Sequence, residues 1–182
     1  MKTLKTFFSV LILVFTFTSC DVEPLDNNID ISTGGGSGTT IAVFTAKVNG
    51  VDFIAESDGI IGDFSTSSIG NELNIAGLNS SGKSITIQLI NPSVGTFEAS
   101  YNVSNLNLLQ YFDTSLGTNG TFLSYNQTTE TSNGSVTITH FDRTTNKVSG
   151  TFSFTGFNPS DSSTKQITNG VFNNIPFENT VD

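Results

Sequence analysis

His140 is the only histidine in the chain, and Asp142 follows it two residues later. Side chains at positions i and i+2 of a β-strand lie on the same face, so these two groups could touch. An imidazole oriented by a carboxylate can act as a general base. A Ser-His-Asp site also needs a positioned nucleophile and an oxyanion hole, and the chain has no G-x-S-x-G motif to supply them. We therefore expect a solvated histidine at a strand end and no catalytic residue.

Acidic residues offer a different chemistry, because glycoside hydrolysis uses two convergent carboxylates. The candidates are Asp52, Glu56, Glu72 and Glu98. Their spacing does not show whether any two converge. A hydrolase therefore remains an alternative that would require two carboxylates about 5–10 Å apart in a cleft.

Metal binding is not expected, and neither is a cofactor. A structural zinc site needs several Cys or His ligands, and the chain contains one of each. The segment Asp26-x-Asn28-x-Asp30 resembles the start of a calcium-binding EF-hand loop. Ile31 then stands where that loop requires Gly, and Ser37 stands where it requires Glu.

The three tyrosines, Tyr101, Tyr111 and Tyr125, are the candidate ligand-binding residues. Exposed aromatic rings can stack on sugars, although the chain lacks tryptophan. The alternative is packing in the core or at its rim, which suits a ring with one polar end.

Cys20 is the only cysteine, and it closes a segment typical of a secretory signal. Lys2 and Lys5 precede an apolar run over residues 7–17, which is shorter than the roughly 20 residues needed to span a bilayer. Phe17 and Ser19 precede Cys20 at the third and first positions. This pattern resembles the lipobox of bacterial lipoproteins. The resemblance implies cleavage of residues 1–19 and lipid attachment at Cys20.

Charge limits the partners that we expect. Removal of residues 1–19 leaves five basic and 16 acidic residues, a net charge of −11. Such a chain repels phosphate backbones and anionic headgroups. We therefore expect no nucleic-acid binding, and membrane attachment through N-terminal acyl chains, of which two or more give stable anchoring.

Residues 20–40 form a predicted tether between the lipid and the folded domain. The segment is acidic at Asp21, Glu23, Asp26 and Asp30, and it contains Gly-rich residues 34–38, which favour a flexible coil. Acids directly after the cysteine also resemble the surface-export signal of Bacteroidota lipoproteins. A solvated linker is the equal alternative, so a periplasmic or a surface-exposed domain is compatible with the sequence.

Residues 41–182 are predicted to form a single all-β domain. Ser, Thr and Asn are abundant, and these residues favour strands and turns over long helices. Asn49-Gly50 predicts a type I′ hairpin turn, and Ile85, Ile87 and Leu89 alternate with polar residues as in a half-buried strand. Residues 102–120 fit a strand or a short helix. We expect an antiparallel β-sandwich or a closed meander barrel of nine or ten strands, over residues 41–48, 51–55, 72–78, 84–90, 96–101, 121–125, 135–142, 147–157, 166–172 and 175–177.

Three segments of the domain resemble a family of small, Flavobacterium-like Bacteroidota lipoproteins of unknown function. The first is Phe44-x-Ala46-x-Val48-Asn49-Gly50-x-x-Phe53. The others are residues 134–154, with Asp142 between two strand-like runs, and residues 167–172. Together they cover most of residues 41–177. The resemblance implies an all-β lipoprotein and carries no known activity.

The sequence therefore predicts a lipid-anchored outer-membrane protein, displayed at the cell surface or in the periplasm. Its β-domain would serve binding, adhesion or envelope structure without catalysis, and its ligand would be an extracellular glycan or protein. The alternative is a glycan-binding accessory protein of a polysaccharide uptake system.

Overall fold

The computed structural model describes residues 41–102 and 105–180. These residues belong to one compact unit, Gly38–Asp182. The expectations for the signal segment, for Cys20, for the tether and for the EF-hand-like segment lie outside the described residues.

The described residues are predominantly β-structure, with two short 3-10 helices, η1 (Ser57–Gly59) and η2 (Thr114–Asn119). The strands are β1 (Val43–Val48), β2 (Val51–Ile54), β3 (Ile60–Ser67), β4 (Gly70–Leu78), β5 (Lys83–Ile90), β6 (Gly95–Glu98), β7 (Ser100–Asn102), β8 (Asn105–Asp113), β9 (Thr121–Leu123), β10 (Tyr125–Asn126), β11 (Thr131–Ser132), β12 (Gly134–Asp142), β13 (Lys147–Phe157), β14 (Thr164–Pro176) and β15 (Glu178–Thr180).

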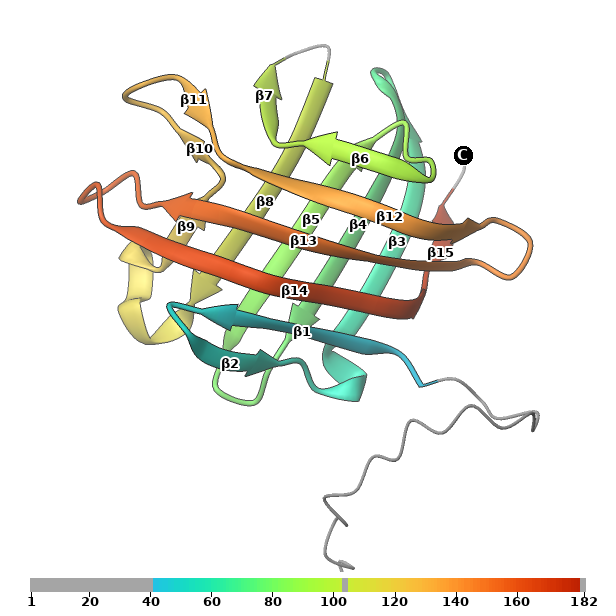
Figure 1. Ribbon diagram of the computed structural model, residues 1–182, viewed down its shortest axis with the longest axis horizontal. Coiled ribbons are helices and arrows are strands. Elements are labelled where there is room, and N and C mark those ends of the chain that lie inside the picture. Colours follow the sequence, from blue (N-terminus) through green and yellow to red (C-terminus); the bar gives the residue numbers. More distant parts are fainter. Residues whose placement is uncertain (1–40, 103–104, 181–182) are drawn as a thin grey trace, which may run out of the picture. The chain divides into compact units, whose positions relative to one another are not determined.

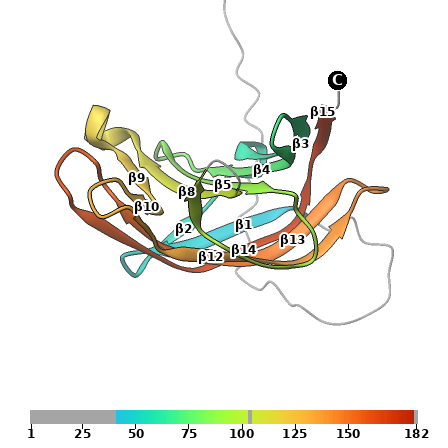
Figure 2. The same cartoon turned by 90° about the horizontal axis from the view of Figure 1, so that it is seen from above.

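One large sheet contains 13 of these described strands, and it curls into a half-barrel. Its main path is β15-β3-β4-β5-β8-β9-β13-β14-β1-β2, with β12 and β6 continuing from β13, and β7 beside β8. Figure 1 shows β12, β13, β14 and β1 crossing over β3, β4, β5 and β8. The view from above shows the two halves facing each other (Figure 2). The prediction of an all-β fold is therefore confirmed at this level.

The core lies between the two halves of the sheet, because each strand turns alternate side chains inward. Ile85, Ile87 and Leu89 of β5 are fully buried, as their alternation predicts. Aromatic rings supply much of the buried area. The largest fully buried side chains include those of Phe44, Phe53, Phe64, Phe122 and Phe172.

Gly77 allows the two halves to approach closely. It lies in β4, and a Cβ atom built on it would lie 2.6 Å from Cδ1 and 2.8 Å from Cγ of Phe44 in β1. Real Cβ atoms do not come this close to other heavy atoms. The absence of a side chain at position 77 therefore makes room for the Phe44 ring.

The number and the direction of the strands differ from the prediction in several respects. β3 was not predicted, because Gly62, Asp63 and the following serines resemble loop residues, yet β3 pairs with β4 along its whole length. Two predicted strands are each divided, residues 96–101 into β6 and β7 and residues 121–125 into β9 and β10. Conversely, the predicted strands 166–172 and 175–177 are joined in β14. β15 pairs with β3 in parallel, whereas the other described pairings are antiparallel. The ambiguous residues 102–120 contain both alternatives, since β8 is followed by η2.

Candidate functional site

A cleft of about 410 Å³ lies where four parts of the sheet end together. They are the β1–β2 turn, the β4–β5 turn, the end of β8 and the start of β14. This size is within the range of small-ligand sites. Its polar walls include Asn49, Asp52, Asn79, Lys83, Asp113 and Lys165.

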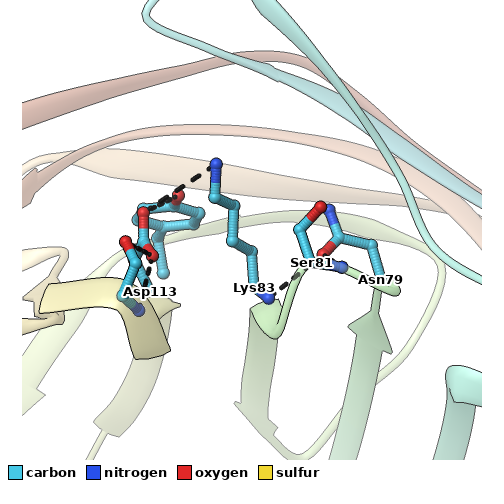
Figure 3. Close-up of polar contacts among 6 residues, drawn as sticks. Asn79, Ser81, Lys83 and Asp113 are labelled. Atoms are coloured by element: carbon cyan, nitrogen blue, oxygen red, sulfur yellow. Dashed lines mark hydrogen bonds and ion pairs between the residues drawn. The ribbon is translucent and has the colours of Figure 1, made fainter. Parts of the chain in front are cut away.

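Lys83 and Asp113 face each other because β5 and β8 pair in a register that sets these two residues opposite. Lys83 Nζ lies 3.9 Å from Asp113 Oδ2, and Figure 3 shows the lysine reaching across toward the carboxylate. The Asp113 side chain is only 11% exposed, whereas that of Lys83 is 40% exposed. The ion pair therefore has one buried partner and one partner that is open to the cleft.

Three further hydrogen bonds hold the Asp113 carboxylate. The Ser115 hydroxyl and backbone N–H donate to Oδ1 at 2.6 and 3.0 Å. The Tyr111 hydroxyl donates to Oδ2 at 3.2 Å. Bonds of this kind to an ionised acceptor are stronger than neutral ones, so the carboxylate is fixed in position.

These contacts also set the protonation states of Asp113 and Tyr111. Burial on its own would raise the pKa of Asp113, but the hydrogen bonds from Ser115 and Tyr111 and the charge of Lys83 outweigh it and lower that pKa. Burial, with the nearby charge of Asp113 and the hydrogen bond to it, raises the pKa of Tyr111 far above its usual value. At neutral pH the site therefore holds a carboxylate and a neutral phenol.

The β4–β5 turn positions Lys83. The side-chain Oδ1 of Asn79 accepts hydrogen bonds from the N–H groups of Ser81 and Lys83, at 3.0 and 3.1 Å (Figure 3). Gly82 follows with a φ of +71°, a conformation that favours glycine. The first residue of η2, Thr114, donates its N–H to the Gly82 carbonyl at 3.3 Å, so the turn is attached to the segment that holds Asp113.

The β1–β2 turn is attached by hydrogen bonds to Gln166, the residue that follows Lys165. Asn49 and Gly50 have φ values of +49° and +82°, which confirms the predicted hairpin turn. Asn49 donates its N–H to the Gln166 carbonyl and accepts from the Gln166 N–H through Oδ1, both at 2.8 Å. The residue before Gln166 is Lys165, whose Nζ lies 5.5 Å from the centroid of the Phe122 ring.

The charges of the cleft leave one ammonium group without a carboxylate partner in the described residues. Asp52 forms its ion pair with Lys47, and Asp113 forms its ion pair with Lys83. Within the described part of the chain, no carboxylate lies within 4.0 Å of the Lys165 ammonium. Lys165 shares this property with Arg143 and Lys147 of the described residues, but of these three only Lys165 lines the cleft.

The predicted tyrosines separate into two places. Tyr111 is 2% exposed and presents its hydroxyl to Asp113, so it is a core residue and cannot serve as a stacking platform. Tyr101 and Tyr125 stack on each other, with ring centroids 4.4 Å apart and an interplanar angle of 18°. Tyr101 is 53% exposed, so this pair presents aromatic surface away from the cleft.

Asp142 is held by the β12–β13 turn, and the charge interaction with His140 is the smallest of the causes that lower its pKa. Asp142 accepts from the Thr145 hydroxyl and from the N–H groups of Thr144 and Thr145, and these bonds lower its pKa. Its carboxylate therefore closes the β12–β13 turn. His140 is exposed, beside a β-bulge that shifts the register between Ile138 and His140.

The four candidate hydrolase carboxylates lie on different elements. Asp52 is in β2, Glu56 precedes η1, Glu72 is in β4 and Glu98 is in β6. Glu72 accepts hydrogen bonds from the amides of Asn74 and Gln88. Across residues 41–102 and 105–180, no three His, Cys, Asp or Glu side chains form a group that could hold a metal ion.

Sequence reasoning did not identify Lys83, Asp113 and Lys165 as site residues. The signal that could have found the first two is the opposite charge at the start of β5 and the end of β8, but it depends on the β5–β8 register.

Neither of the described helices is long and apolar enough to cross a membrane.

Comparison with known proteins gives one family. Residues 40–176 match the family described as Domain of unknown function (DUF6252). No curated protein gives a match to the chain, and no solved structure does so. The match spans the strands from β1 to the end of β14, including all the elements that form the cleft. The chain therefore belongs to the DUF6252 family.

Proposed function

We propose that this protein is a lipid-anchored outer-membrane lipoprotein whose β-domain is a non-catalytic binding module. The observation that carries the proposal is the cleft of about 410 Å³, whose polar groups are already held by hydrogen bonds and ion pairs. Groups fixed before a ligand arrives lose little entropy on binding. Such a cleft suits recognition of a small polar molecule.

The protonation of the buried groups favours binding over catalysis. A general acid or base works best with a pKa near the operating pH. The pKa of Asp113 is lowered and that of Tyr111 is raised, so both move away from neutrality. Their role in the proposal is to hold Lys83 and to shape the end of the cleft.

The anchor in this proposal is Cys20, acylated after removal of residues 1–19. The tether of residues 20–40 then separates the β-domain from the bilayer. The lipobox-like segment before Cys20 supports this part of the proposal, together with the resemblance of residues 41–177 to small Bacteroidota lipoproteins.

The parallel contact of β15 with β3 supports the barrel alternative over two separate sheets.

Metabolic labelling with a tagged fatty acid tests the anchor. The wild-type chain should carry the label and sediment with membranes, whereas Cys20→Ala should carry none and remain in the soluble fraction. Ser37→Ala, in the predicted tether, is the matched control and should behave as the wild type. Label that persists on Cys20→Ala would refute acylation at this residue.

A glycan-binding accessory protein of a polysaccharide uptake system is the second candidate. The stacked pair of exposed Tyr101 and half-buried Tyr125 favours it, because aromatic rings can pack against sugars. The amide and charged groups of the cleft also suit sugar hydroxyls. A glycan-array screen of the purified full-length protein tests this candidate, and retention of no glycan would remove it.

A further inference from the structure

The geometry points to an acidic disaccharide unit as the ligand of the cleft, with a uronic acid beside Lys165 and a neutral sugar in the adjoining hollow. This inference rests on the glycan-binding form of the proposed function. It names the class of sugar and the residue that selects it.

Lys165 is the group that would recognise the carboxylate. Its ammonium contacts the Phe122 ring and, among the described residues, has no carboxylate partner within 4.0 Å. The other two ammonium groups at this end of the domain, on Lys47 and Lys83, already have Asp52 and Asp113. An anionic ligand group would therefore pair with Lys165, the lining ammonium that has no carboxylate partner among the described residues.

Lys83 would give secondary support to the same anion. Its distance of 3.9 Å from Asp113 is long for an ion pair, and 40% of its side chain is exposed. It therefore retains hydrogen-bonding capacity on the side that faces the cleft. The Asp113 carboxylate would keep its position when the anion binds, because its oxygens already accept hydrogen bonds from Ser115 and Tyr111.

A second hollow of about 350 Å³ adjoins the cleft and shares Lys165 as a wall. Leu116, Phe122 and Asp161 also line this hollow. Its apolar side chains suit the C–H face of a sugar, and an exposed carboxylate such as that of Asp161 can accept from hydroxyl groups. The negative charge of Asp161 disfavours a second uronic acid there, so the neutral sugar is assigned to this hollow.

The polar walls of the cleft suit the hydroxyl groups of the uronic acid. The lining includes the side-chain amides of Asn49 and Asn79 and the hydroxyl of Ser81. Val51 is 70% exposed at the same place and offers an apolar contact. A simple carboxylate such as acetate would use only Lys165 and should bind more weakly than the sugar acid.

Titration calorimetry of the purified full-length protein tests this inference with three probes. They are an aldobiuronic acid (a uronic acid linked to a neutral hexose), its carboxyl-reduced analogue, and acetate. We expect the acid disaccharide to bind up to about fivefold more tightly than the reduced analogue, and acetate to bind weakest. A partly exposed charge pair can supply a preference of about this size.

Substitution of Lys165, the residue proposed to select the carboxylate, is the second part of the calorimetric test. Lys165→Met should remove this preference, and Lys165→Arg should retain it because the positive charge remains. Lys147→Met, in β13 and outside both hollows, is the matched control and should retain the preference. Circular dichroism establishes that each variant is folded.

The outcomes separate this inference from the proposed function. Equal binding of the acid and reduced disaccharides, or a preference that persists in Lys165→Met, would overturn the inference and leave sugar binding intact. Binding of acetate as tightly as of the acid disaccharide would reduce the site to an anion site and would also overturn it. Binding of no probe would overturn it too, and the glycan array would then decide whether the glycan-binding form fails as well.

Discussion

Replacement of Asp113 by Asn tests whether the buried carboxylate organises the cleft. Asp113→Asn keeps the size of the side chain but removes its charge. Asp113 accepts three hydrogen bonds, at 2.6, 3.0 and 3.2 Å, and forms the ion pair with Lys83. The asparagine amide would also direct a donor group toward the Tyr111 hydroxyl or the lysine.

The expected loss follows from these contacts. A hydrogen bond to a charged group contributes about 1 kcal/mol more than a neutral one. Three such bonds and a long ion pair therefore give a destabilisation of about 2–3 kcal/mol. For a domain of this size, that free energy corresponds to a fall in melting temperature of roughly 10 °C.

The lowered pKa of Asp113 predicts how the loss of unfolding free energy changes with pH. The pKa of Asp113 is lowered in the folded state, so its contribution to stability is present above the unfolded pKa, near 4. That contribution disappears as the pH falls through the lowered, folded-state pKa. The difference in unfolding free energy between the wild type and Asp113→Asn should therefore be constant from pH 7 to pH 5 and should shrink below pH 4.

Urea unfolding followed by far-UV circular dichroism measures this difference at pH 7, 5, 4 and 3. Asp52→Asn is the matched control, because Asp52 lies at the same cleft but has an exposed side chain paired with Lys47. Its expected cost is below 1 kcal/mol. A loss for Asp113→Asn that is no larger than that of Asp52→Asn, or that is the same at pH 3 as at pH 7, would refute the reasoning.

Two further substitutions test the packing and the turn. Gly77→Ala should destabilise the domain by about 1–3 kcal/mol, because its Cβ would lie 2.6 Å from the Phe44 ring; a melting temperature equal to that of the wild type would contradict the close approach of the two sheet halves. Asn79→Ala should cost about 1–2 kcal/mol, because it removes the acceptor of two backbone N–H groups in the β4–β5 turn. Chemical unfolding measures this cost, and a value near zero would show that the turn holds without its asparagine.

Local features of the sequence were the ones that could be predicted. Asn49-Gly50 specifies a turn through its own backbone preferences, and the alternation of Ile85, Ile87 and Leu89 specifies a buried face through the strand period. Neither prediction depends on a distant segment. Both are confirmed.

Features set by distant segments were missed. β3 contains Gly62, where a Cβ atom would lie 2.4 Å from the carbonyl oxygen of Pro176, so a residue typical of loops is required there by long-range packing. Lys83 and Asp113 are opposite only because β5 pairs with β8, and β8 lies in the segment that the sequence left ambiguous. A cleft built by register could therefore not be derived before the register was known.

The location of the cleft has a physical reason in the curled sheet. Inward-facing positions along the strands are filled by apolar side chains, and inward polar groups would cost free energy there unless they were paired. At the end of the sheet the strands terminate and water reaches the inner face, so charged residues are tolerated. Asp113 is the buried charge at this boundary, and it is held by the Tyr111 and Ser115 groups beside it in the chain. Lys165 lies across the cleft without such a partner among the described residues. A carboxylate already satisfied on one side and an ammonium without a carboxylate partner on the other make this end of the domain the place where we propose that a ligand binds.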